Sequence, residues 1–167
     1  MLLNQEHSAQ DLCRLLADLL IKSELKLATA ESCTGGMISA ACTDLAGSSD
    51  WFERGFVTYS NAAKTELLGV DAALIEAHGA VSEPVARAMA FGAIRHSAAQ
   101  VSIAVTGIAG PTGGSAAKPV GTVWFGFSVQ GSLQSEMQRF AGDRAAVREQ
   151  TVAHALKRVL AILSAEQ

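Results

Sequence analysis

Three segments of the chain combine hydroxyl, amine and glycine residues in patterns that suit acyl-transfer chemistry. The first is AESCTGG at residues 30–36, where Ser32 precedes two glycines at a predicted turn between a strand and a helix. Such a turn can expose a nucleophile and direct backbone N–H groups at a developing oxyanion. The same residue types suit a plain helix cap, because serine and threonine are favoured just before a helix. The residues alone leave both interpretations open.

The second segment, WFERGFVTYSNAAK at residues 51–64, contains Tyr59 and Lys64. A serine hydroxyl needs a base to become a nucleophile, and lysine supplies one where its surroundings lower its pKa towards neutrality. A tyrosine hydroxyl can relay the proton or hydrogen-bond the developing charge. The alternative is ordinary: a lone lysine is usually solvated, and a tyrosine usually packs.

The third segment, TGIAGPTGGSAAKPVGT at residues 106–122, is rich in glycine. Glycine lets the backbone approach a ligand closely, and successive N–H groups form a concavity that binds anions. The GxxxxGK[ST] spacing of a Walker A loop is absent, so the segment does not indicate ATP chemistry. A flexible hairpin-like loop is the competing interpretation.

Two arginines, Arg144 and Arg148, lie one turn apart in GDRAAVRE at the start of the predicted last helix. Arginine binds phosphate through two N–H groups at once, and a helix N-terminus adds a favourable dipole. A pair of solvated surface arginines would give the same sequence.

Helices and strands alternate along the chain, and this alternation indicates how the segments are positioned. Helical patterns occur at 8–22 and 37–45 and begin again near 61, 82 and 143; strand patterns occur at 26–30, 55–60, 100–106, 120–129 and 133–140. The order predicts an α/β fold, a three-layer α/β/α sandwich with a mixed β-sheet, as a single domain over residues 1–167. Each of the three segments follows or ends a predicted strand, so we expect them to share one cleft.

Composition excludes several classes of function. The chain has 167 residues, 49% of them hydrophobic and 17% charged, with a net charge of −3, which gives no basic surface for nucleic acid. No apolar stretch is long enough to span a membrane, and the first ten residues lack the pattern of a signal peptide. Three separated cysteines and four scattered histidines predict free thiols, a cytoplasmic protein and no metal site. Trp51 and Phe52, if exposed, would indicate a homo-oligomer.

Several strings of the sequence, taken together, resemble the CinA C-terminal domain family over about residues 8–163. The strings are AESCTGG, GSSDWFERGFVTYSNAAK, HGAVSEPVA, TGIAGPTGG, KPVGTVW and the GDR start of the last helix. The resemblance implies an amidohydrolase of pyridine nucleotide salvage. Such an enzyme converts nicotinamide mononucleotide, a small-molecule substrate, to nicotinic acid mononucleotide and ammonia without a cofactor.

The resemblance also implies roles for individual residues. Ser32 of the ESCTGG motif would be the nucleophile, and neutral Lys64 of the YSNxxK motif would accept its proton, with Tyr59 orienting or relaying that proton. The residues expected to bind the substrate or its oxyanion are Thr34, Gly35, Gly36, Thr106, Gly107, Ala109, Gly110, Gly114, Lys118, Gly121, Thr122 and Arg144.

Three alternatives remain open on the sequence. Cys33 is a rival nucleophile, because a thiolate is intrinsically more reactive, although no histidine lies near it in sequence to activate it. The chain could instead be a non-catalytic nucleotide-binding or oligomer-forming module, with Ser32 serving as a helix cap. A serine–lysine amidase of other small amides would differ in accepting substrates without phosphate.

Overall fold

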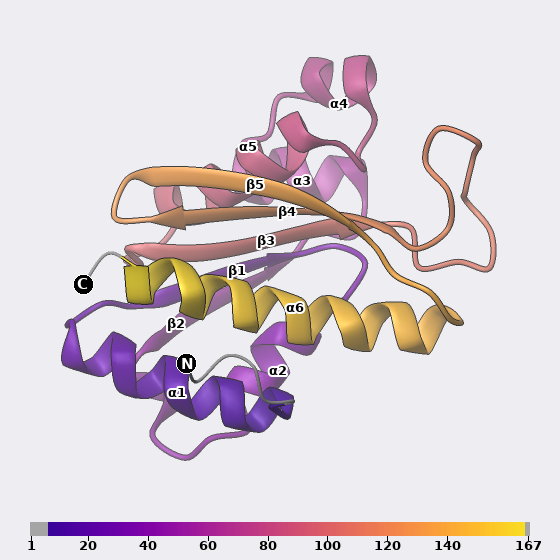
Figure 1. Ribbon diagram of the computed structural model, residues 1–167. Coiled ribbons are helices and arrows are strands. Elements are labelled where there is room, and N and C mark those ends of the chain that lie inside the picture. Colours follow the sequence, from indigo (N-terminus) through magenta and orange to yellow (C-terminus); the bar gives the residue numbers. More distant parts are fainter. Residues whose placement is uncertain (1–6, 166–167) are drawn as a thin grey trace.

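A five-stranded sheet forms the centre of the computed structural model, which describes residues 7–165, and helices cover both of its faces (Figure 1). The strand order is β2-β1-β3-β4-β5. The strands are β1 (Leu27–Glu31), β2 (Phe52–Val57), β3 (Val101–Gly107), β4 (Thr122–Val129) and β5 (Ser132–Arg139). Strand β1 pairs in parallel with β2 and β3, whereas β3–β4 and β4–β5 are antiparallel, which confirms the predicted mixed sheet.

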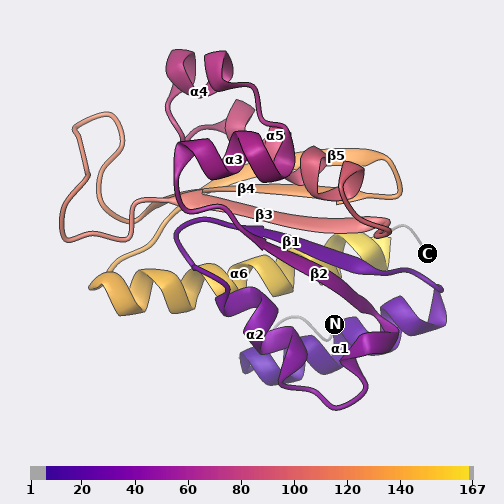
Figure 2. The ribbon, with the colours of Figure 1, turned by 180° about the vertical axis from the view of Figure 1, so that it is seen from behind.

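The helices divide between the two faces of the sheet, as Figures 1 and 2 show from opposite sides. One face carries α1 (Ala9–Lys22), α2 (Met37–Thr43) and α6 (Arg144–Ala165); the other carries α3 (Asn61–Leu68), α4 (Ala72–His78) and α5 (Glu83–Arg95). Successive residues of a strand point to opposite faces. Ile103 of β3 therefore packs in the core between the sheet and helices α1 and α6, and Ala104 packs in the core between the sheet and α5. The three-layer α/β/α sandwich is confirmed.

Local sequence signals account for several element boundaries. Ser8 and Asp11 form a capping box at the start of α1, as their spacing predicts. Asp143 accepts a hydrogen bond from the N–H of Ala146 (2.9 Å) and so starts α6 at the expected place. The turn between β4 and β5 has positive φ at both Gln130 (45°) and Gly131 (91°), as a two-residue hairpin requires.

Several boundaries differ from the sequence prediction; β2, for example, starts at Phe52 rather than at residue 55. Strand β2 ends at Val57 rather than at residue 60, because its partner β1 ends at Glu31, which pairs with Val57 and offers no further strand beyond it. Helix α3 begins at Asn61, as predicted, and is capped by Ser60, whose hydroxyl accepts the N–H of Ala63 (3.0 Å). Helix α4 was not predicted; Asp71 caps it through the N–H of Ala73 (2.9 Å).

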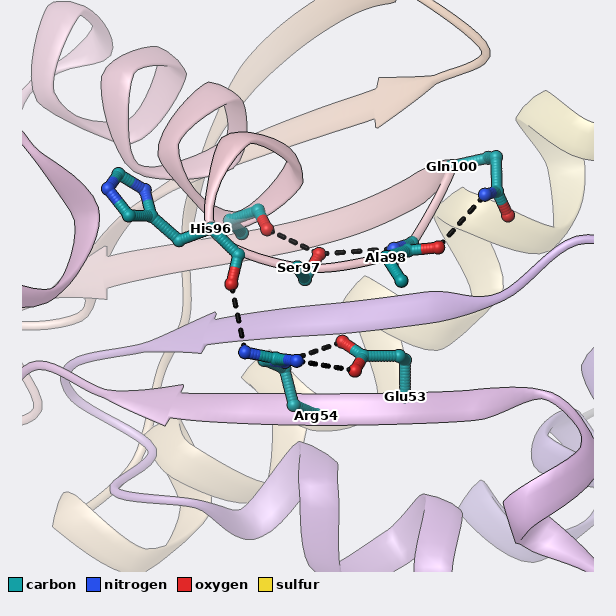
Figure 3. A network of polar contacts seen from close by, with 8 residues as sticks. Glu53, Arg54, His96, Ser97, Ala98 and Gln100 are labelled. Atoms are coloured by element: carbon teal, nitrogen blue, oxygen red, sulfur yellow. Dashed lines mark hydrogen bonds and ion pairs between the residues drawn. The ribbon is translucent and has the colours of Figure 1, made fainter.

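The edge strand β2 carries an ion pair between two consecutive residues, and its arginine also bonds a neighbouring loop (Figure 3). The Arg54 guanidinium donates to both carboxylate oxygens of Glu53 (2.6 and 2.7 Å) and to the carbonyl oxygen of His96 (3.0 Å), just after α5. Charges on an edge strand disfavour pairing with another chain. The same guanidinium therefore protects the edge and ties the α5–β3 connection to β2.

The aromatic pair on which the expectation of a homo-oligomer depended lies mostly inside the molecule. Trp51 is only 1% exposed and belongs to the core, and Phe52 packs partly buried against it. These two side chains therefore do not support an oligomer. Within residues 7–165, no helix has both the length and the apolar character needed to cross a bilayer.

Candidate active site

The fold brings Ser32 and Lys64 into direct contact although they lie 32 residues apart in sequence. Ser32 directly follows β1, and its N–H donates to the carbonyl of Val105 on β3 (3.0 Å). Lys64 lies one turn into α3. Its Nζ lies 3.0 Å from Ser32 Oγ, and both side chains are buried. The contact therefore has the distance required for direct proton transfer.

Lys64 has an environment that favours its neutral form. The side chain is 1% exposed, and burial lowers the pKa of its amine below the ordinary value of 10.5. Within the described part of the chain, no carboxylate forms an ion pair with it. Its two other partners are the carbonyl oxygens of Thr58 (2.8 Å) and Tyr59 (3.5 Å), which can only accept. A neutral amine that donates to both carbonyls directs its lone pair at Ser32 Oγ.

A cavity of about 260 Å³ opens above this pair. It lies at the carboxyl ends of β1 and β3, at the end of the sheet from which the long loop after β3 projects (Figure 1). Its lining consists of Ser32, Cys33, Tyr59, Asn61, Lys64, Ala80, Val81, Thr106, Gly107, Ala109 and Arg144. All three segments singled out in the sequence thus contribute to one cleft, together with the start of α6.

Tyr59 lies at the rim of the cavity rather than at its base. Its side chain is 63% exposed, and its hydroxyl lies 3.3 Å from Nη2 of Arg144. Arg144 also donates to the carbonyl oxygen of Gly110 (3.0 Å). Among the described residues, Ser32 and Lys64 form no hydrogen bond with the Tyr59 hydroxyl, so the proton relay predicted for it has no contact to support it. The backbone carbonyl of Tyr59, not its phenol, reaches Lys64.

The three residues after Cys33 were expected to bind the oxyanion, but they do not face the cavity. Thr34, Gly35 and Gly36 are not part of the lining. Thr34 is fully buried, and its hydroxyl donates to Glu31 (2.7 Å); the N–H of Gly35 donates to the carbonyl of Ser32 (3.1 Å). Of the three, only Thr34 is directed at the protein interior; Gly35 is exposed and Gly36 is partly exposed on the outside of the turn.

The glycine-rich loop contributes only its first part to the cavity. Thr106, Gly107 and Ala109 line it, whereas Gly110, Gly114, Lys118, Gly121 and Thr122 do not. Lys118 donates to the carbonyl of His78 (2.7 Å), and the hydroxyl of Thr122 donates to the carbonyl of Pro119 (2.6 Å). A Cβ at Gly121 would lie 2.1 Å from the carbonyl oxygen of Phe140. These later residues shape the loop itself and tie it to α4.

A buried carboxylate, Glu31, lies directly before Ser32 and was missed in the sequence analysis. Its oxygens accept from the hydroxyls of Thr34 and Ser39 (2.7 and 2.8 Å) and from the N–H groups of Ile38 and Ser39 (2.8 and 2.9 Å). The sequence signal that could have indicated Glu31 is an acidic residue at the end of β1, whose other residues are uncharged.

Asn61, Ala80 and Val81 of the cavity lining were also missed in the sequence analysis. In residues 7–165, no cluster of histidine, cysteine and acidic side chains could hold a metal ion.

The rival nucleophile Cys33 lines the same cavity, but its surroundings keep it protonated. Its side chain is 6% exposed, and burial raises the pKa of the thiol to about 12. The lining contributed by the described residues includes no histidine that could act as its base. The geometry therefore favours Ser32 over Cys33.

The chain is similar to known proteins over most of its length. A family model described as "CinA C-terminal domain" matches residues 9–163. The chain is 58% identical over 132 residues to the nicotinamide-nucleotide amidohydrolase PncC of Enterobacter agglomerans, covering 78% of this chain and 80% of that protein. It is 55% identical over 130 residues to PncC of Escherichia coli strain K12, covering 77% and 79%. The crystal structure of the competence damage-inducible protein A (ComA) from Klebsiella pneumoniae matches with a TM-score of 0.93 and 37% identity, covering 96% of this chain and 100% of that chain.

Proposed function

The chain belongs to the CinA C-terminal domain family, and on that basis we propose that it hydrolyses the amide of nicotinamide mononucleotide to give nicotinic acid mononucleotide and ammonia. The observation that carries the proposal is the buried amine of Lys64 at 3.0 Å from Ser32 Oγ, at the base of a cavity bordered by Arg144. The names of the relatives supply the substrate. We assign the reaction to cytoplasmic pyridine nucleotide salvage.

Acylation begins when neutral Lys64 accepts the hydroxyl proton of Ser32. Ser32 Oγ forms a bond to the carboxamide carbon, and the carbonyl electron pair moves onto oxygen to give a tetrahedral oxyanion. When this intermediate collapses, the C–N bond breaks, and the Lys64 ammonium returns its proton to the leaving nitrogen. Ammonia departs and leaves a nicotinoyl ester on Ser32.

Deacylation again uses Lys64, first as proton acceptor and then as proton donor. Lys64, neutral again, accepts a proton from a water molecule that attacks the ester carbon. The C–O bond to Ser32 breaks, and the proton on Lys64 passes to Ser32 Oγ. The carboxylate product then leaves, and Ser32 and Lys64 have returned to their original protonation states.

The oxyanion needs a hydrogen-bond donor close to Ser32. Among the candidates at residues 34–36, the N–H of Gly35 already donates to the Ser32 carbonyl, whereas the N–H of Thr34 has no acceptor among the described residues. Thr34, however, is fully buried and outside the cavity lining, so we assign the oxyanion to the N–H of Cys33, which directly follows Ser32 and lines the cavity. A well-placed donor of this kind lowers the barrier by roughly 3 kcal/mol.

Arg144 is positioned to bind the phosphate of the nucleotide. It borders both the catalytic cavity and an adjoining hollow of about 660 Å³, which lies at the start of α6. Its present partners, the Tyr59 hydroxyl and the Gly110 carbonyl, are neutral, so a phosphate would be a stronger acceptor. Binding energy from this contact orients the amide and favours the nucleotide over free nicotinamide.

Ammonia release from nicotinamide mononucleotide by the purified protein tests the proposal. The Ser32→Ala variant should lose turnover by about 10³-fold or more and still bind the nucleotide. Cys33→Ala is the matched control, which should retain turnover because a protonated thiol takes no part.

The alternatives predict different results. Nucleotide binding without ammonia release from the wild-type protein would indicate a non-catalytic nucleotide-binding module. Equal turnover of nicotinamide lacking ribose and phosphate would indicate an amidase of other small amides.

A further inference from the structure

Arg148 lies one turn after Arg144 on α6 and borders the same hollow, but its guanidinium bonds the backbone beside Ser32. Its Nε and Nη2 donate to the carbonyl oxygens of Cys33 and Thr34, both at 3.1 Å. In a trans peptide the N–H points away from the carbonyl that precedes it. Arg148 therefore fixes the two peptides with their N–H groups, those of Thr34 and Gly35, on the side away from α6.

Glu31 holds the same turn from its other side. Its carboxylate accepts the hydroxyl of Thr34 and two N–H groups in the first turn of α2, from Ile38 and Ser39. A fully buried carboxylate is stable only when several donors reach it, so this arrangement is rigid. The neighbouring strand accommodates the network with Gly55, where a Cβ would lie 2.2 Å from Ser39 Oγ.

Both residues contact Thr34: the Glu31 carboxylate accepts its hydroxyl, and Arg148 donates to its carbonyl oxygen. We propose that Glu31 and Arg148 are positioning residues that fix the turn at residues 32–35. They keep Ser32 Oγ within hydrogen-bond distance of Lys64 Nζ. The inference rests on the proposed function, in which Ser32 is the nucleophile. It explains why Thr34 is buried and outside the cavity.

The Arg148→Ala variant is the first test. We expect kcat for nicotinamide mononucleotide to fall by about 10²-fold, because a displacement near 1 Å at the reacting atoms has an effect of this size. KM should change by less than about threefold, because Arg144 still binds the phosphate. Arg158→Ala is the matched control: this arginine lies on the same helix but bonds Glu136 (2.7 Å), and its loss should leave kcat unchanged.

Chemical rescue separates positioning from general destabilisation. Guanidinium ion at millimolar concentration should restore part of the kcat of Arg148→Ala, because it can occupy the vacated site and donate to both carbonyls. It should not accelerate the wild type or Arg158→Ala. Arg148→Lys should fall between the wild type and alanine, since one ammonium group does not match the spacing of two neighbouring carbonyls.

A double variant tests whether both residues act on one turn. Thr34→Val removes the hydroxyl that Glu31 holds and keeps the shape of the side chain. If both contacts hold the same turn, Arg148→Ala and Thr34→Val together should reduce kcat by clearly less than the product of the two single effects. If the double variant reduces kcat by the product of the two single effects, the two contacts act independently and the joint role is overturned.

The rate at which a fluorophosphonate labels Ser32, followed by intact mass, provides a readout that needs no nucleotide. Arg148→Ala should label at least about tenfold more slowly than the wild type. If Arg148→Ala labels and turns over like the wild type, the inference fails while the proposed function stands. If the wild type labels normally but releases no ammonia, the proposed function fails, and the labelling rates alone decide whether Arg148 positions Ser32.

Discussion

Replacing Gly92 with alanine should destabilise the protein and slow catalysis, even though the residue lies in the middle of a helix far from Ser32 in sequence. Alanine at a free position inside a helix is favoured over glycine by about 1 kcal/mol. Gly92 of α5, however, packs directly against the end of α3. A Cβ there would lie 2.1 Å from the carbonyl oxygen of Leu68 and 2.9 Å from its Cβ.

The magnitude follows from that contact. The two helices must separate by about 1 Å before the Cβ reaches 3.0 Å from the carbonyl oxygen, and backbone atoms cannot rotate away. Overpacking of this kind costs about 1–3 kcal/mol, and a backbone obstacle places it near the upper end. After the gain in helix propensity, the net loss is about 2 kcal/mol, or about 4–8 °C in Tm. Because Leu68 lies one turn from Lys64, kcat should fall by about 10- to 100-fold.

Thermal unfolding and ammonia release measured on the same preparation check both parts. Ala88→Gly, one turn earlier in α5, serves as the control: it should lose about 1 kcal/mol through helix propensity and keep its turnover. A higher Tm for Gly92→Ala with unchanged kcat would refute the reasoning, because it would mean that α3 does not depend on this close approach.

Four further predictions concern Lys64 and its surroundings. Because burial lowers the pKa of Lys64, kcat/KM should rise with pH through that pKa, below 10.5; a flat profile would exclude lysine as the base. Between that pKa and 10.5 the unfolded chain binds more protons than the folded chain, so the free energy of unfolding should also rise with pH in this window. Lys64→Met should abolish ammonia release yet raise Tm at neutral pH, since it removes a buried amine that is costly to charge; a lower Tm would contradict this. Thr58→Val should stabilise the protein by about 1 kcal/mol in chemical denaturation, because the buried hydroxyl of Thr58 has no partner among the described residues.

The parts of the fold that could be predicted from sequence are those set by local chemistry. The capping box at Ser8, the turn at Gln130–Gly131 and the carboxylate cap at Asp143 each depend on residues within four positions of one another. Helix α4 escaped prediction because it spans only Ala72–His78, too short for a helical repeat of apolar residues to stand out.

The two arginines at the start of α6 show where sequence reasoning stops. Arg144 and Arg148 are the same residue type on the same helix, so their spacing alone could not distinguish a phosphate-binding arginine from a solvated one. Their partners are set by backbone far away in sequence: the carbonyls of Cys33 and Thr34 lie more than 100 residues before Arg148. No local pattern records that contact, and the same holds for the donors that converge on Glu31.

The error at the end of β2 bears directly on the chemistry. If β2 extended to residue 60, the carbonyls of Thr58 and Tyr59 would belong to a strand. Because β1 ends at Glu31, these carbonyls have no neighbouring strand, and α3, which starts after Ser60, carries Lys64 back towards them. They then accept N–H groups of the Lys64 amine, which in the proposed mechanism orients its lone pair towards Ser32. The position of the proposed base therefore depends on where β2 ends, and so on the length of β1 beside it.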